Sequence, residues 1–222
     1  MKKAITLTFL CFFSLGLNAQ IKYNSGGKSS QPKTKGFETQ KLVFGGWGTL
    51  RFWDGATRLG ATPIVGYKLT KNFTAGVSLG YLYESYADIS NFYNPTTGRQ
   101  ESYPERYHTL TPGIWARYSI LNSFYIQTHF EDAFMRMNRT IPAANAKGKG
   151  SDKISFSMPT LLVGLGYYSQ LSDKVALYFG FYYDVLQNST KKTVTSTGGY
   201  IYDVKSPYSG TIYPVIGVGI GF

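Results

Sequence analysis

The chain has 222 residues and a formal net charge of +11, and 43% of its residues are hydrophobic, 17% aromatic and 16% charged. This apolar and aromatic content excludes disorder over most of the chain, and the single cysteine, Cys11, excludes a disulfide framework or a multi-cysteine metal site. The positive charge does not indicate a nucleic-acid partner, because the sequence contains no basic helix or basic stripe.

The first segment, residues 1–19, has the pattern of a signal peptide. Lys2 and Lys3 are followed by an apolar run that is too short to span a membrane, and a small-residue cleavage site ends at Ala19. Residues 20–37 are rich in glycine, serine and lysine, which predicts a flexible N-terminal tail. No later segment approaches about 20 continuous apolar residues. An exported chain of this kind is either a soluble secreted protein or a β-barrel.

Residues 38–222 are predicted to form one domain of eight strands, because alternation with period two recurs along them. The expected strands are residues 40–53, 57–69, 73–86, 105–120, 124–137, 154–170, 174–187 and 209–222. Short turns at 70–72, 121–123 and 172–173 alternate with longer connections at about 87–104, 138–153 and 188–208. Pro63, Pro112, Pro159 and Pro214 lie roughly fifty residues apart, which suggests a repeated hairpin with each proline at a similar height near a bulge or rim.

The two faces of each expected strand differ in a way that determines what surrounds the domain. In the strand after Asn72, the odd-numbered residues from Phe73 to Tyr83 are apolar or aromatic, whereas the even-numbered residues are mostly small or polar. Charged residues within strands share the face of the glycines. The large apolar faces of eight strands do not fit inside one small lumen, so we expect them to face lipid. The predicted fold class is an all-β, eight-stranded antiparallel up-and-down transmembrane β-barrel.

This architecture resembles the small outer-membrane β-barrel family, the OmpA/OmpX-like proteins with a "porin family" outer-membrane β-barrel domain, over about residues 38–222. The most specific part is the C-terminal segment, which looks like the signal read by the outer-membrane assembly machinery, with Gly217, Ile220 and Phe222 at matching positions. Val215 departs from that signal, because a polar residue is usual there. The resemblance implies an outer-membrane location, a periplasmic tail, periplasmic short turns and three extracellular long loops.

Eight strands enclose an interior just wide enough to be filled by side chains. The charged or titratable residues expected on the inward face are Arg51, Lys68, Glu84, Arg117, His129, Glu131 and Asp184. Buried charges need partners, so we expect these residues to form a paired network that plugs the lumen. A narrow porin or small-solute transporter is the alternative, because inward glycines can also leave cavities.

The long loops are the expected place of interaction. Their bases carry cations at the height of lipopolysaccharide phosphates, and ordinary solvated charge is the competing interpretation. The residues expected to contact lipopolysaccharide or a partner are Arg139, Lys147, Lys149, Lys191 and Lys192. The expected partners are therefore outer-membrane lipid and lipopolysaccharide, the assembly machinery and a larger envelope complex, with no nucleic acid.

Enzyme signals in the sequence are weak. Some eight-stranded barrels edit lipid A with a histidine and a serine two residues apart, but His108 precedes Leu110 and His129 precedes Glu131 at that spacing. With two histidines in the chain, a metal or acid–base site at His129 is less favoured than a structural network. We expect no catalytic residue, no metal and no cofactor, and a structural or interaction role. A lipid-modifying barrel enzyme is a distant alternative.

Overall fold

The computed structural model describes residues 38–94, 98–120, 123–142, 149–189, 192–197, 199, 201–210 and 212–221. The predicted signal peptide and tail lie outside these residues, and so do Lys147, Lys191 and Phe222. Over the described ranges, no helix has the length and apolar character needed to cross a membrane.

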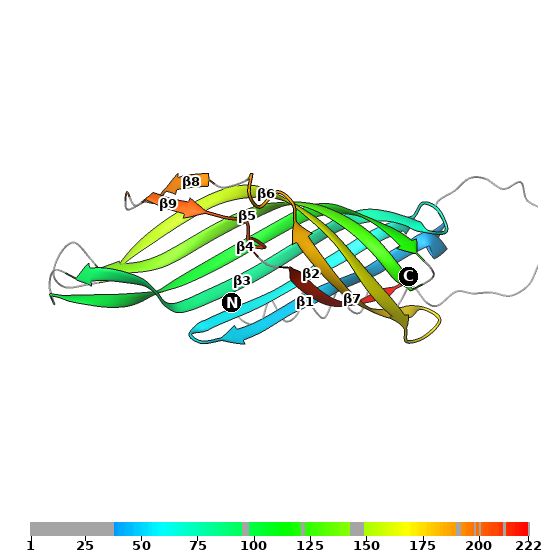
Figure 1. Cartoon of the computed structure of the whole chain (residues 1–222), viewed down its shortest axis with the longest axis horizontal. Coiled ribbons are helices and arrows are strands. Elements are labelled where there is room, and N and C mark those ends of the chain that lie inside the picture. Colours follow the sequence, from blue (N-terminus) through cyan, green and yellow to red (C-terminus); the bar gives the residue numbers. More distant parts are fainter. Residues whose placement is uncertain are drawn as a thin grey trace, which may run out of the picture. The chain divides into compact units, whose positions relative to one another are not determined.

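The described residues form a closed barrel and a separate hairpin (Figure 1). The strands are β1 (Leu42–Trp53), β2 (Ala56–Lys68), β3 (Phe73–Asn94), β4 (Arg99–Ile120), β5 (Phe124–Pro142), β6 (Lys149–Gln170), β7 (Val175–Asp184), β8 (Lys192–Thr195), β9 (Ile201–Val204) and β10 (Tyr213–Ile220). A 3-10 helix, Thr39–Lys41, precedes β1. The barrel closes in the order β1-β10-β7-β6-β5-β4-β3-β2, and β8 pairs with β9. The predicted eight-stranded antiparallel up-and-down barrel is confirmed.

The first and last strands close the barrel, with Gly46 opposite Val218 and Trp47 opposite Gly217. Both glycines leave room for groups of the neighbouring strands. A Cβ atom on Gly46 would lie 2.7 Å from the carbonyl oxygen of Thr62, and one on Gly217 would lie 2.3 Å from the ring of Tyr178. Gly217, one residue of the predicted assembly signal, therefore also has a packing role at the seam.

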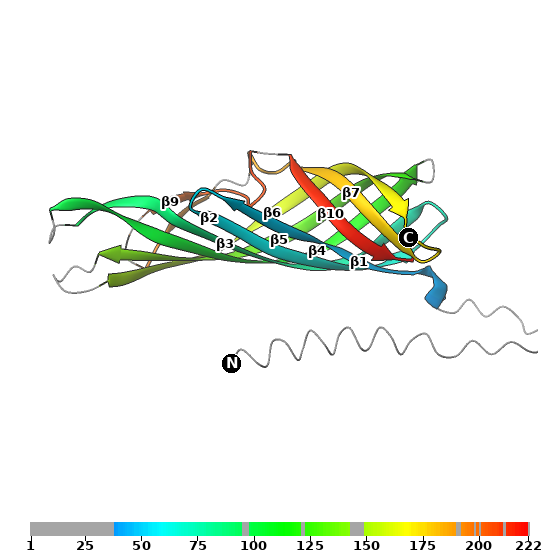
Figure 2. The ribbon, with the colours of Figure 1, turned by 90° about the horizontal axis from the view of Figure 1, so that it is seen from below.

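The barrel wall is taller on one side, because β3, β4, β5 and β6 continue beyond their neighbours (Figure 2). β3 pairs with β2 as far as Tyr86, and β6 pairs with β7 only from Leu162 onward. The predicted loops at 87–104 and 138–153 are thus wrong in their extent, since most of these residues belong to strands. Polar residues interrupt both faces of these extensions, so they lack the regular apolar alternation on which the prediction depended.

The four repeated prolines lie within strands rather than at a bulge. Pro63 pairs with Gly46, Pro112 with Leu79, Pro159 with Asp132 and Pro214 with Phe181. The register shift between β3 and β4 lies between Tyr86 and Ser90, away from Pro112. The predicted bulge at a proline is therefore not observed in this pair, and β4 continues through Pro112.

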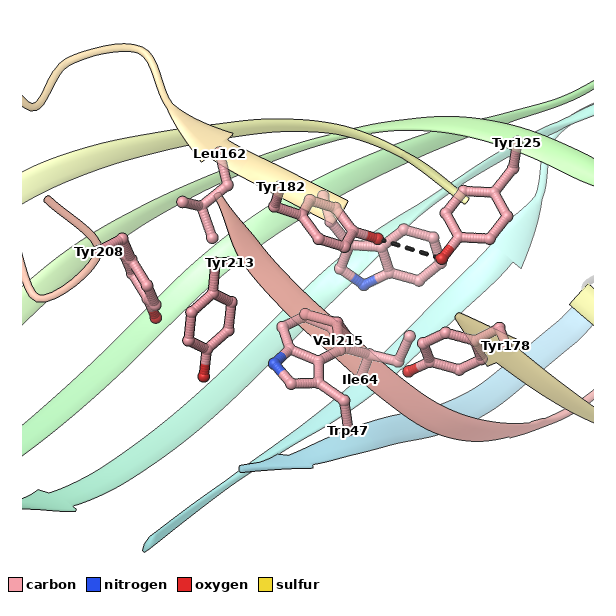
Figure 3. Close-up of a cluster of buried hydrophobic side chains, with 10 residues drawn as sticks. Trp47, Ile64, Tyr125, Leu162, Tyr178, Tyr182, Tyr208, Tyr213 and Val215 are labelled. Atoms are coloured by element: carbon pink, nitrogen blue, oxygen red, sulfur yellow. Dashed lines mark hydrogen bonds between the residues drawn. The ribbon is translucent and has the colours of Figure 1, made fainter. Parts of the chain in front are cut away.

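Side chains alternate between the lumen and the outside along the barrel strands. In β10, Tyr213 and Val215 are buried, whereas Pro214, Ile216 and Val218 are exposed. The outward face carries most of the exposed large hydrophobic residues, among them Leu50, Val77, Leu79, Ile114, Ile126, Phe130, Phe134, Leu165, Phe179, Phe181 and Ile216. The lumen holds a cluster of buried aromatic and aliphatic residues (Figure 3). Apolar side chains therefore cover the outside, and charged and aromatic side chains fill the inside.

Candidate functional site

The half of the lumen nearest the short turns is occupied by Arg117 and aromatic rings. The Arg117 side chain is 2% exposed, and its Nε atom donates a hydrogen bond to Gln127 Oε1 at 2.9 Å. Its guanidinium carbon lies 4.3 Å from the ring centre of Tyr125 and 5.0 Å from that of Tyr178. Figure 3 shows these two tyrosines in the same cluster as Trp47. Arg117 is thus surrounded by π faces, which stabilise a desolvated cation.

The middle of the lumen holds a polar group formed by Ser78, His129 and Glu131. His129 Nε2 lies 2.6 Å from Ser78 Oγ, and His129 Nδ1 lies 3.2 Å from Glu131 Oε1. Glu131 Oε2 accepts a hydrogen bond of 3.0 Å from the hydroxyl of Tyr208. The edge of Trp47 packs against the His129 ring, with the ring centres 5.4 Å apart.

The order serine, histidine and carboxylate is that of a hydrolase triad, and here the group is enclosed in the lumen. His129 and Glu131 are fully buried, and Ser78 is 8% exposed. The small cavity beside Tyr208 and Tyr213 has a volume of about 10 Å³, which is at most enough for one water molecule.

Toward the long strands, the lumen contains the ion pair of Arg58 and Glu84. Arg58 Nε lies 3.2 Å from Glu84 Oε1, and Arg58 Nη2 donates to the carbonyl oxygen of Pro207 at 2.6 Å. The sequence prediction named Glu84 but missed Arg58. Strand alternation contained the signal, because Arg58 shares the even-numbered face of β2 with Lys68.

The remaining predicted lumen residues have different surroundings. Asp184 is fully buried and accepts hydrogen bonds from the backbone amides of Leu161 at 3.1 Å and Leu186 at 3.0 Å, so it fixes the end of β7. Arg51 is exposed at the mouth formed by the long strands, and Lys68 is half-buried at the opposite end. The structure therefore brings together His129 and Glu131 and pairs Glu84 with a residue that was not predicted.

The chain between β7 and β10 folds back over the lumen, and Arg139 holds part of it. Arg139 forms an ion pair with Glu105, and its Nη1 atom donates to the hydroxyl of Tyr202 at 2.7 Å. The Tyr202 hydroxyl donates to Asp152 Oδ2 at 3.1 Å. Burial, opposed by Arg139 and assisted by the bond to Asp152, raises the pKa of Tyr202 to about 12. Arg139 lies in β5 and is engaged inside the wall, whereas the sequence prediction placed it in a loop that contacts lipid.

A cavity of about 740 Å³ lies between this returning segment and the tall wall. Met135, Met137 and Phe156 line one side of it, and Arg51 and Lys205 line another. Within the described ranges, no three His, Cys, Asp or Glu side chains gather closely enough to hold a metal ion.

The other predicted loop cations are only partly described. Lys149 begins β6, and Lys192 lies exposed in β8, where its Nζ atom donates to the carbonyl oxygen of Ser157 at 2.8 Å. Arg106, Arg136 and Lys153 are three further outward cations, which lie in the long strands. Because residues 138–153 were assigned to a loop, the sequence could not show on which face of the barrel wall Lys153 lies.

No family model and no curated protein matches the chain. Among solved structures, it is similar to a major outer membrane protein from Thermus thermophilus, with 13% identity, a TM-score of 0.45, and coverage of 81% of this chain and 98% of that one. It is similar to the translocator domain of autotransporter NalP from Neisseria meningitidis, with 14% identity, a TM-score of 0.39, and coverage of 100% and 98%. It is also similar to the Yersinia pestis outer membrane protein Ail, with 12% identity, a TM-score of 0.32, and coverage of 81% and 96%.

Proposed function

We propose that this chain is an integral outer-membrane β-barrel protein with a structural or interaction role and a lumen plugged by its own side chains. The observation that carries the proposal is the apolar exterior of a closed barrel. Leu50 is 70% exposed, Leu165 64% and Ile114 61%, and they belong to three different strands. Soluble monomers rarely expose a continuous apolar patch of more than a few hundred Å². A closed barrel surrounded by such residues is explained by lipid.

The height of the apolar surface supports the same proposal. On β5, the outward face from Phe124 to Phe134 is hydrophobic except at Thr128 and Asp132, and at a rise of about 3.3 Å per residue it covers about 33 Å of strand. At a strand tilt of about 40°, this is about 25 Å along the barrel axis, the height of the apolar band of an outer-membrane barrel. Arg136 follows on the same face and is exposed.

The filled interior supports a closed lumen. Tyr178 and Tyr182 are 0% and 2% exposed, and the hydroxyl of Tyr182 donates to that of Tyr125 at 3.4 Å across the lumen (Figure 3). Tyr208 enters from the returning segment and is 7% exposed. We therefore propose that the protein neither conducts ions nor acts as an enzyme. The long strands and the cavity at their mouth would carry its interactions.

Reconstitution tests this function in two separate steps. The purified chain is folded into phosphatidylcholine vesicles, and planar-bilayer conductance is recorded from the same preparation. We expect lipid-dependent folding with no stable conductance steps. A chain that is folded and monomeric in water without detergent would overturn the membrane assignment. Reproducible conductance steps would overturn the plug and favour the narrow-pore alternative. Fractionation of the source cells adds the location, which we expect to be the outer membrane.

A further inference from the structure

Three outward cations form a group on the tall side of the barrel. Arg106 of β4, Arg136 of β5 and Lys153 of β6 are all exposed. Arg106 pairs with Asn138, which is two residues from Arg136, and Asn138 in turn pairs with Lys153. Both Arg106 and Lys153 are therefore diagonal neighbours of Arg136, at the usual diagonal spacing of about 7–8 Å, with the Cβ atoms somewhat closer. Their flexible side chains can converge on one group.

These cations have no acidic partner. Among the described residues, no carboxylate forms an ion pair with Arg106, Arg136 or Lys153. Glu105 and Asp152, next to Arg106 and Lys153 in sequence, are buried on the inward face, and Asp132, four residues before Arg136 on the same outward face of β5, forms no ion pair with it. Neighbouring like charges repel each other, and an external anion removes this cost. Two inward arginines differ, since Arg58 is paired with Glu84 and Arg139 with Glu105.

The position of the group indicates which anion reaches it. Leu110 and Phe134, which pair with each other, are the last large outward hydrophobic residues on β4 and β5 before the cations. His108 lies between them and Arg106, and its Nδ1 atom is 2.8 Å from the hydroxyl of Tyr81. Histidine and tyrosine at this level fit the border between hydrocarbon and headgroups, where amphipathic rings collect. The cations begin where the hydrocarbon ends.

We propose that Arg106, Arg136 and Lys153 form a binding site for the phosphate of a lipid headgroup on the outer wall of the barrel. The proposal rests on the membrane assignment above and names the partner of this surface as a phosphorylated lipid of the surrounding leaflet. The two guanidinium groups provide paired donors that match phosphate oxygens, and the ammonium adds a point charge. The site is made of strand residues, so it is held in place without the long loops.

The test compares matched charge-removing variants in micelles of neutral detergent. The site variant carries Arg106→Gln, Arg136→Gln and Lys153→Gln. The control variant carries Lys71→Gln, Arg99→Gln and Lys174→Gln, which remove three exposed cations from turns and a strand end. Binding of bisphosphorylated lipid A, of dephosphorylated lipid A and of inorganic phosphate is measured by titration. Both variants are first checked for lipid-dependent folding.

We expect the site variant to bind bisphosphorylated lipid A about a hundredfold more weakly than the wild type, and the control variant to bind it unchanged. Dephosphorylated lipid should bind weakly to all three proteins, and inorganic phosphate should not compete at the concentration of the lipid. Equal binding by the wild type and the site variant would overturn the site, as would an equal loss with the dephosphorylated lipid. Competition by free phosphate at equal concentration would show an ion site in place of a lipid site. Failure of the wild type to fold into lipid would instead overturn the membrane assignment.

Discussion

The hydroxyl of Tyr208 donates a hydrogen bond of 3.0 Å to Glu131. A residue of the returning segment between β7 and β10 is therefore bound to a carboxylate in the middle of the lumen. The Tyr208 ring also packs edge-on against Tyr213, with the ring centres 5.1 Å apart. This contact joins the last external connection to the opposite wall of the barrel, because Tyr208 precedes β10 and Glu131 lies in β5.

Substitution of Tyr208 separates the roles of its ring and its hydroxyl. Tyr208→Phe should lower the free energy of unfolding by about 1–3 kcal/mol, because a buried carboxylate loses a donor. Tyr208→Ala should lower it by about 3–5 kcal/mol, because it also leaves a cavity. Urea unfolding in phospholipid vesicles, followed by tryptophan fluorescence, measures both. A phenylalanine variant as stable as the wild type would show that the hydrogen bond contributes nothing.

Removing one member of the Arg58–Glu84 pair should lower the free energy of unfolding strongly, whereas replacing both members should change it little. Arg58→Met leaves Glu84 buried without its cation and should destabilise the barrel by about 3–5 kcal/mol. Adding Glu84→Met should recover most of this loss, since an apolar pair of similar volume is often neutral. The same unfolding assay on the two single variants and the double variant gives the coupling. Additive losses in the double variant would contradict the pairing.

Arg117 should tolerate methionine better than alanine. Its guanidinium is surrounded by Trp115, Tyr125 and Tyr178, so a long apolar side chain can fill the same space. We expect Arg117→Met to cost less than about 1.5 kcal/mol and Arg117→Ala about 3 kcal/mol, because the shorter side chain leaves a void. Equal losses for both variants would mean that the positive charge, and not the packing, is what the site requires.

Two glycines near the seam between β1 and β10, Gly217 and Gly48, should differ in how well they tolerate alanine. Gly217→Ala places a methyl group against the ring of Tyr178 and should destabilise the barrel by about 1–3 kcal/mol or prevent folding. Gly48→Ala is the matched control, because its nearest neighbour would be the carbonyl oxygen of Gly60 at 3.8 Å. The folded fraction after refolding into vesicles measures both. Similar yields for the two variants would refute the close contact at Gly217.

Docking of the returning segment should weaken in alkaline solution. The pKa of Tyr202 is raised from its ordinary value of about 10 to about 12, so the phenol is neutral in both docked and released states below pH 10. Above pH 10 the released form loses its proton first, and the stabilisation declines until the docked form ionises near pH 12. The difference in absorbance at 295 nm between the wild type and Tyr202→Phe should show one step near pH 12. Asp152→Asn should move this step to lower pH, and a step near pH 10 in the wild type would contradict the docking.

The sequence predicted the half of the barrel nearest the short turns well, because the inward and outward faces of the strands differ strongly there. Between Phe73 and Tyr83, outward residues are large and apolar and inward residues are mostly small, so alternation is visible without a structure. After Tyr86 polar residues interrupt both faces of β3, and the same reasoning ended the strand eight residues before Asn94. The hairpin of β8 and β9 was missed because each of its strands has only four residues, which is too short for alternation to be recognised.

The partners of the lumen charges could not be read from alternation. Alternation gives the face of a residue, but the pairing of Arg58 with Glu84 depends on the register between β2 and β3. The surroundings of Arg117 depend on Tyr178, which β7 brings across the lumen. The outward group around Arg136 likewise needs two registers at once, those of β4 with β5 and of β5 with β6.

The unequal strand lengths make two opposite sides of the barrel different. Four neighbouring strands, β3 to β6, project beyond β1, β2, β7 and β10, and the cations lie outside the projecting side. A molecule that approaches the side of the short strands reaches the rim of the barrel directly. One that approaches the side of β3 to β6 first meets the projecting strands and their cations. The surface that the barrel presents to an adjacent molecule therefore depends on its rotation about the barrel axis. An assembly that includes this barrel must hold it in one rotational orientation.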